Sequence, residues 1–391
     1  MKNLGCATLV LALAACASPG TPPGGPVDTQ APKIVRIAPD SAKTGVNPRE
    51  VVFEFDEVVN ERPAGAASLN ALFLISPRNG ETEASWHRHS ISVRPHRGFK
   101  PNTTYTIELL PGLSDLRGNA RNTGAETVFS TGPTIATGRI GGTLFNWAEG
   151  RTVARGLVEA RPVTDTGTVY ITTTDSIGDF ALRHVPPARY RVLGYSDDNH
   201  NHGIDPREPF DSAIVDLTDT AKIELLAFVH DSVGTRLASV SVRDSVTLEL
   251  VFDNPLSVKT LPTPASILIR GSDSTEIIPV ASVTAPPADT AITAPTRAAA
   301  GAPTPTITPP PPVRKPSRPV PLRSLIVKLT RPLRPKITYR VRVTDVQNLI
   351  GVAKTSEKEV SLPVPPAPTA EKKPPVNVPP PTTKPPQPVK K

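Results

Sequence analysis

The densest group of polar residues lies between positions 197 and 208, in the run Asp-Asp-Asn-His-Asn-His-Gly-Ile-Asp-Pro-Arg-Glu. Positions 1, 3, 5, 7, 9 and 12 of this run have the spacing with which calcium-binding loops supply hard oxygen ligands. The residues at these positions are Asp197, Asn199, Asn201, Gly203, Asp205 and Glu208. Two interpretations stay open: a calcium site, or a solvated turn whose Asn and Asp side chains bond to their own backbone.

His202 departs from the calcium-loop pattern, because it stands at the sixth position, where such loops need a glycine for a sharp turn. No amphipathic helix flanks the run, so bound calcium would stiffen a loop between modules. No cofactor other than calcium is indicated. The sequence contains no nucleophile-elbow, phosphate-loop, dinucleotide or zinc-protease motif, so we expect no enzymatic activity.

Cysteine and proline are distributed unevenly. Both cysteines lie within the first 16 residues, which excludes a disulfide framework or a thiolate metal site from the rest of the chain. Of the 48 prolines, 29 lie in residues 17–33, 286–321 and 361–391, where no aromatic residue falls. Such segments bury too little apolar surface to offset chain entropy. We therefore expect an extended tether, a disordered insertion and a disordered tail.

The formal charge of +8 belongs largely to the same segments. Lys2 contributes +1, the insertion +3 and the tail +4, so the remaining residues carry no net charge. The tail has lysine pairs but no aromatic residue for base stacking, which argues against nucleic acid as a partner. A basic tail of this kind suits an anionic polymer of the cell envelope, or envelope proteins.

The N-terminus has the pattern of a signal peptide: a basic start, then an apolar run over residues 7–15 that is too short for a membrane-spanning helix. Leu13-Ala14-Ala15-Cys16 resembles the bacterial lipobox, which implies lipidation of Cys16. Several acyl chains together give a stable membrane anchor. Ala17 replaces the aspartate associated with inner-membrane retention and thus favours the outer membrane. Ordinary signal cleavage, without a lipid anchor, is the alternative.

Short alternating or β-branched runs recur along the folded part, with Gly, Pro, Asn and Asp between them, and predict an all-β fold of tandem sandwiches. The first six runs are Ile34–Ile37, Val51–Phe55, Leu72–Ile75, Ser90–Arg94, Thr104–Leu110 and Thr127–Ser130. The ordered motifs from Pro32 to Gly132 resemble the bacterial Ig-like domain of S-layer type (SbsA-like). Tyr105 follows a Pro-Asn turn, which favours a tyrosine corner: a buried ring whose hydroxyl bonds to nearby backbone.

A degenerate copy of these motifs follows near the C-terminus. Residues 246–255 and 326–341 repeat the first region, with Tyr339 in the place of Tyr105. The repeated motifs are 37 positions farther apart in the second copy, almost the length of the 36-residue segment 286–321. We therefore expect this segment to be a long loop within a second Ig-like domain.

The middle region resembles transthyretin-like or CnaB-like β-sandwich modules. Its Gly-Arg-Ile-Gly-Gly strand begins at Gly138, a Gly turn precedes Phe180, and a Pro-Pro turn precedes Tyr190. No lysine lies between Lys100 and Lys222, which excludes the Lys–Asn isopeptide bond of some CnaB-like domains.

The expected organisation has six parts. They are a lipoprotein signal peptide (1–16), a Pro/Gly tether (17–33), an Ig-like domain (34–133), a transthyretin/CnaB-like β-sandwich (134–220), a degenerate Ig-like domain (221–360, insertion 286–321) and a Pro/Lys-rich tail (361–391). The resemblances imply a non-catalytic structural or adhesive scaffold, lipid-anchored in the cell envelope at the outer membrane. The alternatives are a calcium-dependent glycan- or ligand-binding lipoprotein and an accessory subunit of an envelope hydrolase.

Overall fold

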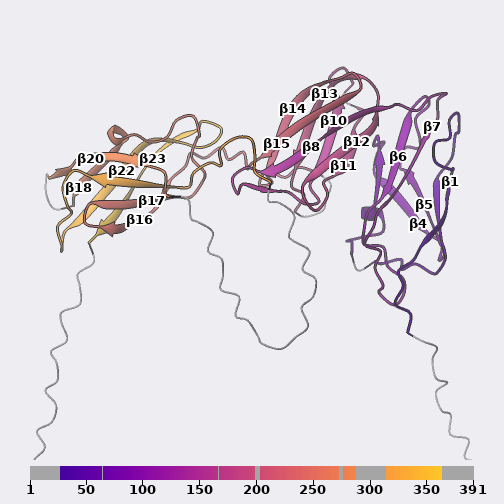
Figure 1. Ribbon diagram of the computed structural model, residues 1–391, viewed down its shortest axis with the longest axis horizontal. Helices are drawn as coiled ribbons and strands as arrows, with labels where there is room; N and C mark the ends of the chain where they lie inside the picture. Colours follow the sequence, from indigo (N-terminus) through magenta and orange to yellow (C-terminus); the bar gives the residue numbers. More distant parts are fainter. Residues whose placement is uncertain are drawn as a thin grey trace, which may run out of the picture. The chain divides into compact units, whose positions relative to one another are not determined.

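The computed structural model describes residues 27–63, 65–165, 167–198, 203–272, 276–287 and 314–362 (Figure 1). Outside the described residues lie the signal peptide with Cys16, most of the tether and insertion, nearly all of the tail, and Asn199 and Asn201. The described parts form antiparallel sheets with two short 3-10 turns, so the predicted all-β fold of tandem sandwiches is confirmed. No helix in these parts is long and apolar enough to cross a membrane.

The first sandwich has a four-stranded sheet of order β1-β2-β5-β4 and a three-stranded sheet of order β3-β6-β7. Alternation in β2 places Val51, Phe53 and Phe55 in the core between them. The sequence pattern predicts all these strands except β4, which is polar and half-buried. The elements are β1 (Ile34–Ala38), β2 (Val51–Phe55), η1 (Asn70–Leu72), β3 (Phe73–Ser76), β4 (Thr82–Trp86), β5 (Ser90–Pro95), β6 (Thr104–Leu109) and β7 (Ala125–Ser130).

The tether was expected to reach residue 33, but its last residues pack on this sandwich. Lys33 N donates to Asp56 Oδ1 at 2.8 Å, Arg121 donates to Pro32 O at 3.3 Å, and Pro32 is buried. These hydrogen bonds satisfy backbone groups just before β1, so the domain begins earlier than the proline content indicates.

The middle sandwich has sheets of order β11-β10-β13-β14 and β12-β8-β15, with β9 paired to β8. The sequence predicts the end of this module at residue 220. β15 begins there, forms the edge of the second sheet and buries Leu225 and Ala227 in the core. The strands are β8 (Gly138–Asn146), β9 (Arg151–Thr152), β10 (Leu157–Pro162), β11 (Tyr170–Thr173), β12 (Asp179–Val185), β13 (Ala188–Tyr195), β14 (Phe210–Leu217) and β15 (Thr220–Ala227).

The second Ig-like domain repeats the topology of the first. Its sheet order β16-β17-β21-β20 matches β1-β2-β5-β4, and β19-β18-β22-β23 matches β3-β6-β7 with one added edge strand. The elements are β16 (Leu237–Asp244), β17 (Thr247–Phe252), η2 (Pro264–Ser266), β18 (Ile267–Gly271), β19 (Ile277–Ile278), β20 (Val280–Thr284), β21 (Ser324–Leu329), β22 (Thr338–Gln347) and β23 (Ala353–Ser361).

The proline-rich insertion enters between β20 and β21, where the first copy has the short β4–β5 hairpin. The sequence predicts disorder for the whole of this insertion, but the structure shows contacts at its C-terminal end. Trp147 Nε1 donates to Pro319 O at 2.9 Å, and Pro321 is buried. A buried indole N–H needs an acceptor, so this bond fixes the chain just before β21.

Two compact units divide the chain. The first unit contains the first and middle sandwiches, and the second contains the second Ig-like domain together with Asn146–Arg151. Each sandwich has its own apolar core. Within the first unit, a fourth cluster combines Leu74 of the Ig-like sandwich with Leu157, Ile171 and Tyr195 of the middle sandwich.

Candidate functional site

The two predicted tyrosine corners have the same geometry. The Tyr105 hydroxyl accepts a hydrogen bond from Lys100 N at 2.6 Å, and the Tyr339 hydroxyl accepts one from Arg334 N at 3.0 Å. Both rings are 0% exposed, and each acceptor lies five residues after its donor. Each tyrosine therefore ties the turn before β6 or β22 to the core of its own sandwich.

Replacing either tyrosine with phenylalanine should destabilise only the unit that contains it. Tyr105→Phe or Tyr339→Phe leaves one backbone N–H without its acceptor, at a cost of about 1–2 kcal/mol. Trp86 belongs to the first unit and Trp147 to the second, and the chain has no other tryptophan. Urea unfolding followed by tryptophan fluorescence measures the free energy of unfolding of each unit. For each measurement the tryptophan of the other unit is changed to phenylalanine, so that the signal comes from one unit. A matching loss in both units from one substitution would contradict this expectation.

The predicted calcium loop is described only at its two ends. Asp197 and Glu208 are buried, with 6% and 5% exposure. Glu208 Oε1 accepts from Asp198 N and Oε2 from Asp205 N, each at 3.0 Å, so this carboxylate closes the loop across its base. Burial of both end carboxylates is more than a fully solvated turn requires. Calcium binding there stays a prediction.

A second acidic group, which the sequence patterns do not predict, lies at one end of the first sandwich. Asp28, Glu57 and Asp115 each offer a carboxylate oxygen within 4.8 Å of the others. Hard divalent cations prefer such donors. Burial raises the pKa of Asp115, but hydrogen bonds from Asn119 and from backbone N–H groups outweigh it and hold that pKa below its ordinary value. Burial, Asp115 and Asp28 raise the pKa of Glu57.

In the second Ig-like domain, asparagines stand at the places of two of these acidic residues. Asn348 takes the place of Asp115: its Oδ1 accepts from the backbone N–H groups two and four residues later, as Asp115 Oδ1 does. Asn254, two residues after β17, takes the place of Glu57, two residues after β2. The Asn254 Nδ2 donates to Asp231 Oδ2 at 2.9 Å. The second copy thus has an amide bonded to a carboxylate, whereas in the first copy three carboxylates face one another.

Glu57→Gln should raise the melting temperature of the first unit in metal-free buffer at pH 7, because it removes a repelled carboxylate. A raised carboxyl pKa means that ionised Glu57 opposes folding, and this cost disappears as pH falls through the raised pKa. The gain should therefore shrink at pH 4. Glu54→Gln is the control, since the Glu54 side chain is 43% exposed and lies 3.8 Å from Arg36. Equal effects of both variants would contradict the repulsion.

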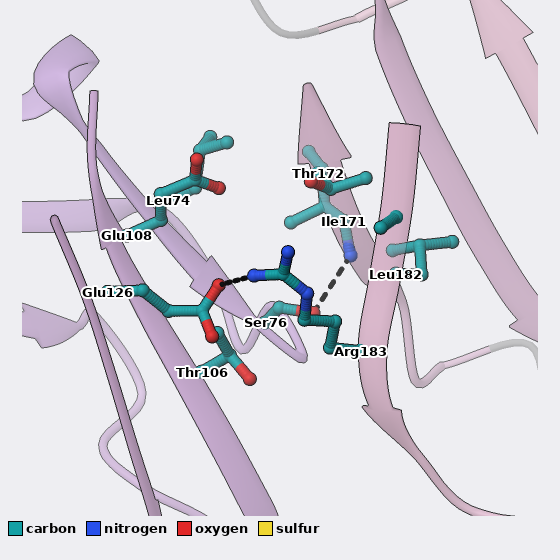
Figure 2. A pocket seen from close by; sticks show the side chains of 10 residues that line it. Leu74, Ser76, Thr106, Glu108, Glu126, Ile171, Thr172, Leu182 and Arg183 are labelled. Atoms are coloured by element: carbon teal, nitrogen blue, oxygen red, sulfur yellow. Dashed lines mark hydrogen bonds and ion pairs between the residues drawn. The ribbon is translucent and has the colours of Figure 1, made fainter. Parts of the chain in front are cut away.

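The most extensive polar arrangement is a joint between the two sandwiches of the first unit. We use "joint" for the contacts of residues 74–78 with the middle sandwich. Arg78 N donates to Val169 O at 2.7 Å. Figure 2 shows the second bond, in which Ile171 N donates to Ser76 Oγ at 3.0 Å. Leu74 adds the apolar contact described above. Backbone pairing, a side-chain bond and apolar packing thus act at one place.

Glu159 is the buried charge of the joint. Glu159 is 2% exposed, and its carboxylate lies 3.3 Å from Arg78 and 2.7 Å from Arg161. The Tyr195 hydroxyl donates to Glu159 Oε1 at 3.2 Å, and burial raises the pKa of Tyr195. A buried carboxylate is stable only when paired and hydrogen-bonded. Arg78 comes from the other sandwich, whereas Arg161 lies on β10 like Glu159 itself, so one of the two ion pairs of Glu159 depends on the joint being closed.

Beside the joint, a second ion pair links the two sandwiches. Arg183 of β12 reaches Glu126 of β7 at 3.0 Å, and Glu108 of β6 lies in the same group (Figure 2). The space between them is about 10 Å³, room for no more than one water molecule. Burial and Glu126 raise the pKa of Glu108 to about 7, while Arg183 opposes this rise. The ion pairs Arg78–Glu159 and Arg183–Glu126 therefore each join a side chain of the first sandwich to one of the middle sandwich.

Comparison with known protein families gives a match that covers the first sandwich. A family model for a bacterial Ig-like domain matches residues 28–131. The N-terminal part of the bacterial S-layer protein SbsC aligns at 18% identity and TM-score 0.23, covering 34% of this chain and 25% of that one. BcpA, the major pilin subunit of Bacillus cereus, aligns at 10% identity and TM-score 0.18, covering 51% and 70%.

A putative carbohydrate binding protein from Bacteroides uniformis aligns at 10% identity and TM-score 0.18, covering 58% of this chain and 100% of that one. No curated protein matches the chain. The family match and the strand order, rather than these distant structures, support the assignment. Residues 28–131 form a bacterial Ig-like domain, the first of the tandem β-sandwiches of this chain.

Proposed function

We propose that the protein is a non-catalytic scaffold of the bacterial cell envelope, anchored by lipid at Cys16 in the outer membrane, that holds its β-sandwiches at a fixed distance from the membrane. The observation that carries this proposal is the joint. Domain interfaces within a chain move by default unless they are extensive. Here backbone bonds, a buried ion pair and apolar packing act together between two sandwiches.

The lipid anchor supports the scaffold role because it would fix one end of the chain. Residues 28–33 already bond to the first sandwich, so the tether of residues 17–27 is short. Fully extended, about ten residues span roughly 35 Å. The first sandwich would therefore stay near the membrane surface, and the basic tail would contact anionic envelope polymer or an envelope protein.

Membrane fractionation of the full-length protein tests the anchor. Cys16→Ser should release the protein from the membrane fraction, whereas Cys6→Ser should not, because Cys6 lies in the removed signal peptide. Retention of Cys16→Ser in the membrane would overturn the anchor. Deletion of residues 363–391, which leaves β23 intact, should abolish co-sedimentation with isolated envelope polymer while leaving unfolding of both units unchanged. Unchanged co-sedimentation would overturn the role of the tail.

Burial of Asp197 and Glu208 favours a second candidate, a calcium-dependent ligand-binding lipoprotein. Calcium titration by calorimetry on the full-length protein should release heat and raise the melting temperature of the first unit. Asp205→Asn should weaken this effect, while Asp216→Asn, on an exposed strand position, should not. Absence of both heat and a melting shift would exclude calcium at this loop.

A further inference from the structure

The second Ig-like domain has a pocket at the end that corresponds to the acidic group of the first copy. Its volume is about 120 Å³. A cavity of about 150 Å³ holds one benzene ring, so this pocket would enclose a larger ring only in part, with the rest of the ring in solvent. The walls come from the segment before β16, the loop after β17, the residue before β21 and the β22–β23 loop; they include Phe228, Asp231, Asn254, Arg323, Leu349 and Ile350.

The aromatic wall is held in place before any ligand binds. Phe228 contacts Trp147 edge-on, with ring centroids 5.8 Å apart, and stacks on His230 at 4.2 Å. Trp147 is itself 6% exposed and bonded to Pro319 O. Because these neighbours fix the Phe228 ring, a ligand that packs on it would not have to order the side chain first.

Arg323 supplies the cationic group of the pocket. Its residue is exposed, and its backbone oxygen accepts from Phe252 N, which holds the Cα beside the pocket. Among the residues that the structure describes, none pairs with the Arg323 guanidinium. A guanidinium presents a planar pair of N–H donors that matches a carboxylate. An arginine that lines a pocket without a carboxylate partner therefore favours a carboxylate on the ligand.

Hydrogen-bond acceptors complete the pocket. Asp231 Oδ1 accepts from Val233 N at 2.8 Å, and Oδ2 accepts from Asn254 Nδ2 at 2.9 Å, so each oxygen keeps a second lone pair. Asn254 Oδ1 is a further acceptor beside it. These oxygens accept hydrogen bonds from hydroxyl groups. An aliphatic side chain of a bound peptide would leave the remaining lone pairs of these oxygens without a donor.

We propose that this pocket binds one carboxylated six-membered sugar unit, such as a uronic acid, of an acidic polysaccharide. The carboxylate pairs with Arg323, sugar hydroxyls donate to Asp231 and Asn254, and the carbon face of the ring packs on Phe228, Leu349 and Ile350. The inference extends the proposed envelope function by naming a ligand class. Its pocket geometry is independent of the lipid anchor.

Saturation-transfer NMR and calorimetry on the full-length protein, with sodium glucuronate and neutral glucose as probes, test the proposal. Glucuronate should bind at least about 10-fold more tightly than glucose, the factor expected for one charge-assisted hydrogen-bond pair. Arg323→Gln should abolish this preference. Arg342→Gln, which removes an exposed guanidinium from β22 of the same domain, should preserve it.

Equal binding of glucuronate and glucose, binding of neither, or an Arg323→Gln variant with unchanged preference would each overturn the proposal. N-acetyl-leucine serves as the probe for a peptide carboxyl terminus. Tighter binding of N-acetyl-leucine than of glucuronate, dependent on Arg323, would assign the pocket to peptides and overturn the sugar assignment. None of these outcomes bears on membrane release by Cys16→Ser, so the two proposals fail separately.

Discussion

Arg78→Ala is expected to lower the free energy of unfolding of the first unit by about 3 kcal/mol. The substitution leaves Glu159 buried with Arg161 as its remaining basic partner. Breaking a buried pair by removing one partner costs about 3–5 kcal/mol when the remaining charge is uncompensated, and the remaining pair with the more exposed Arg161 puts the expected loss at the lower end of this range.

Urea unfolding monitored by Trp86, in a Trp147→Phe background, measures this loss in the first unit. Arg189→Ala is the matched control: Arg189 lies 3.5 Å from Asp216, and both side chains are exposed, so the expected cost is below about 1 kcal/mol. Adding Glu159→Gln to Arg78→Ala should recover part of the stability, because the buried charge is then gone. Equal costs for Arg78→Ala and Arg189→Ala would contradict a contribution from the buried pair.

The first unit should become less stable as pH rises from about 4.5 to about 7, and Glu108 should be a main cause. Its pKa is raised from 4.5 to about 7 by burial and by Glu126. The folded state therefore holds the proton more tightly than the unfolded state does. Stability from this group is fully present below the unfolded pKa and is lost as pH approaches the folded pKa. The loss is up to about 3 kcal/mol, at 1.36 kcal/mol per pKa unit.

Glu108→Gln should remove most of this pH dependence, because glutamine stays neutral and fits the same space. The measurement is the urea midpoint of the Trp86 signal at pH 5 and pH 8, in the parent and the variant. Glu61→Gln, at an exposed position, should leave the dependence of the parent unchanged. The same pH dependence in the parent and in Glu108→Gln would show that Glu108 ionises in the folded state at its ordinary pKa.

The strands were predictable from the sequence because each buries a local alternation of apolar residues. Val51, Phe53 and Phe55 show this in β2, whereas β4 lacks it and was not predicted. The repeated copy was also predictable, since the motifs around Tyr105 and Tyr339 keep their order. Every one of these signals is local in the chain, or repeats a local pattern.

The joint was not predictable for the opposite reason. Arg78 and Glu159 lie in different sandwiches, and neither has a sequence neighbour that marks it as part of a pair. The acidic group was not predictable for the same reason: Asp28, Glu57 and Asp115 lie far apart in the sequence, and their proximity depends on how the sandwich closes. The place of β15 in the middle sandwich, beyond the predicted boundary at residue 220, also depends on pairing in a sheet.

The joint also has a consequence for solubility. β3 is the outer strand of the sheet β3-β6-β7, and β11 is the outer strand of β11-β10-β13-β14. An outer strand offers unpaired N–H and C=O groups to any other extended chain, which is a common start of aggregation. Where Arg78 pairs with Val169, the two outer strands shield each other's edges. Closing the joint therefore covers part of both outer strands, and a variant that opens it exposes their unpaired backbone groups to neighbouring molecules.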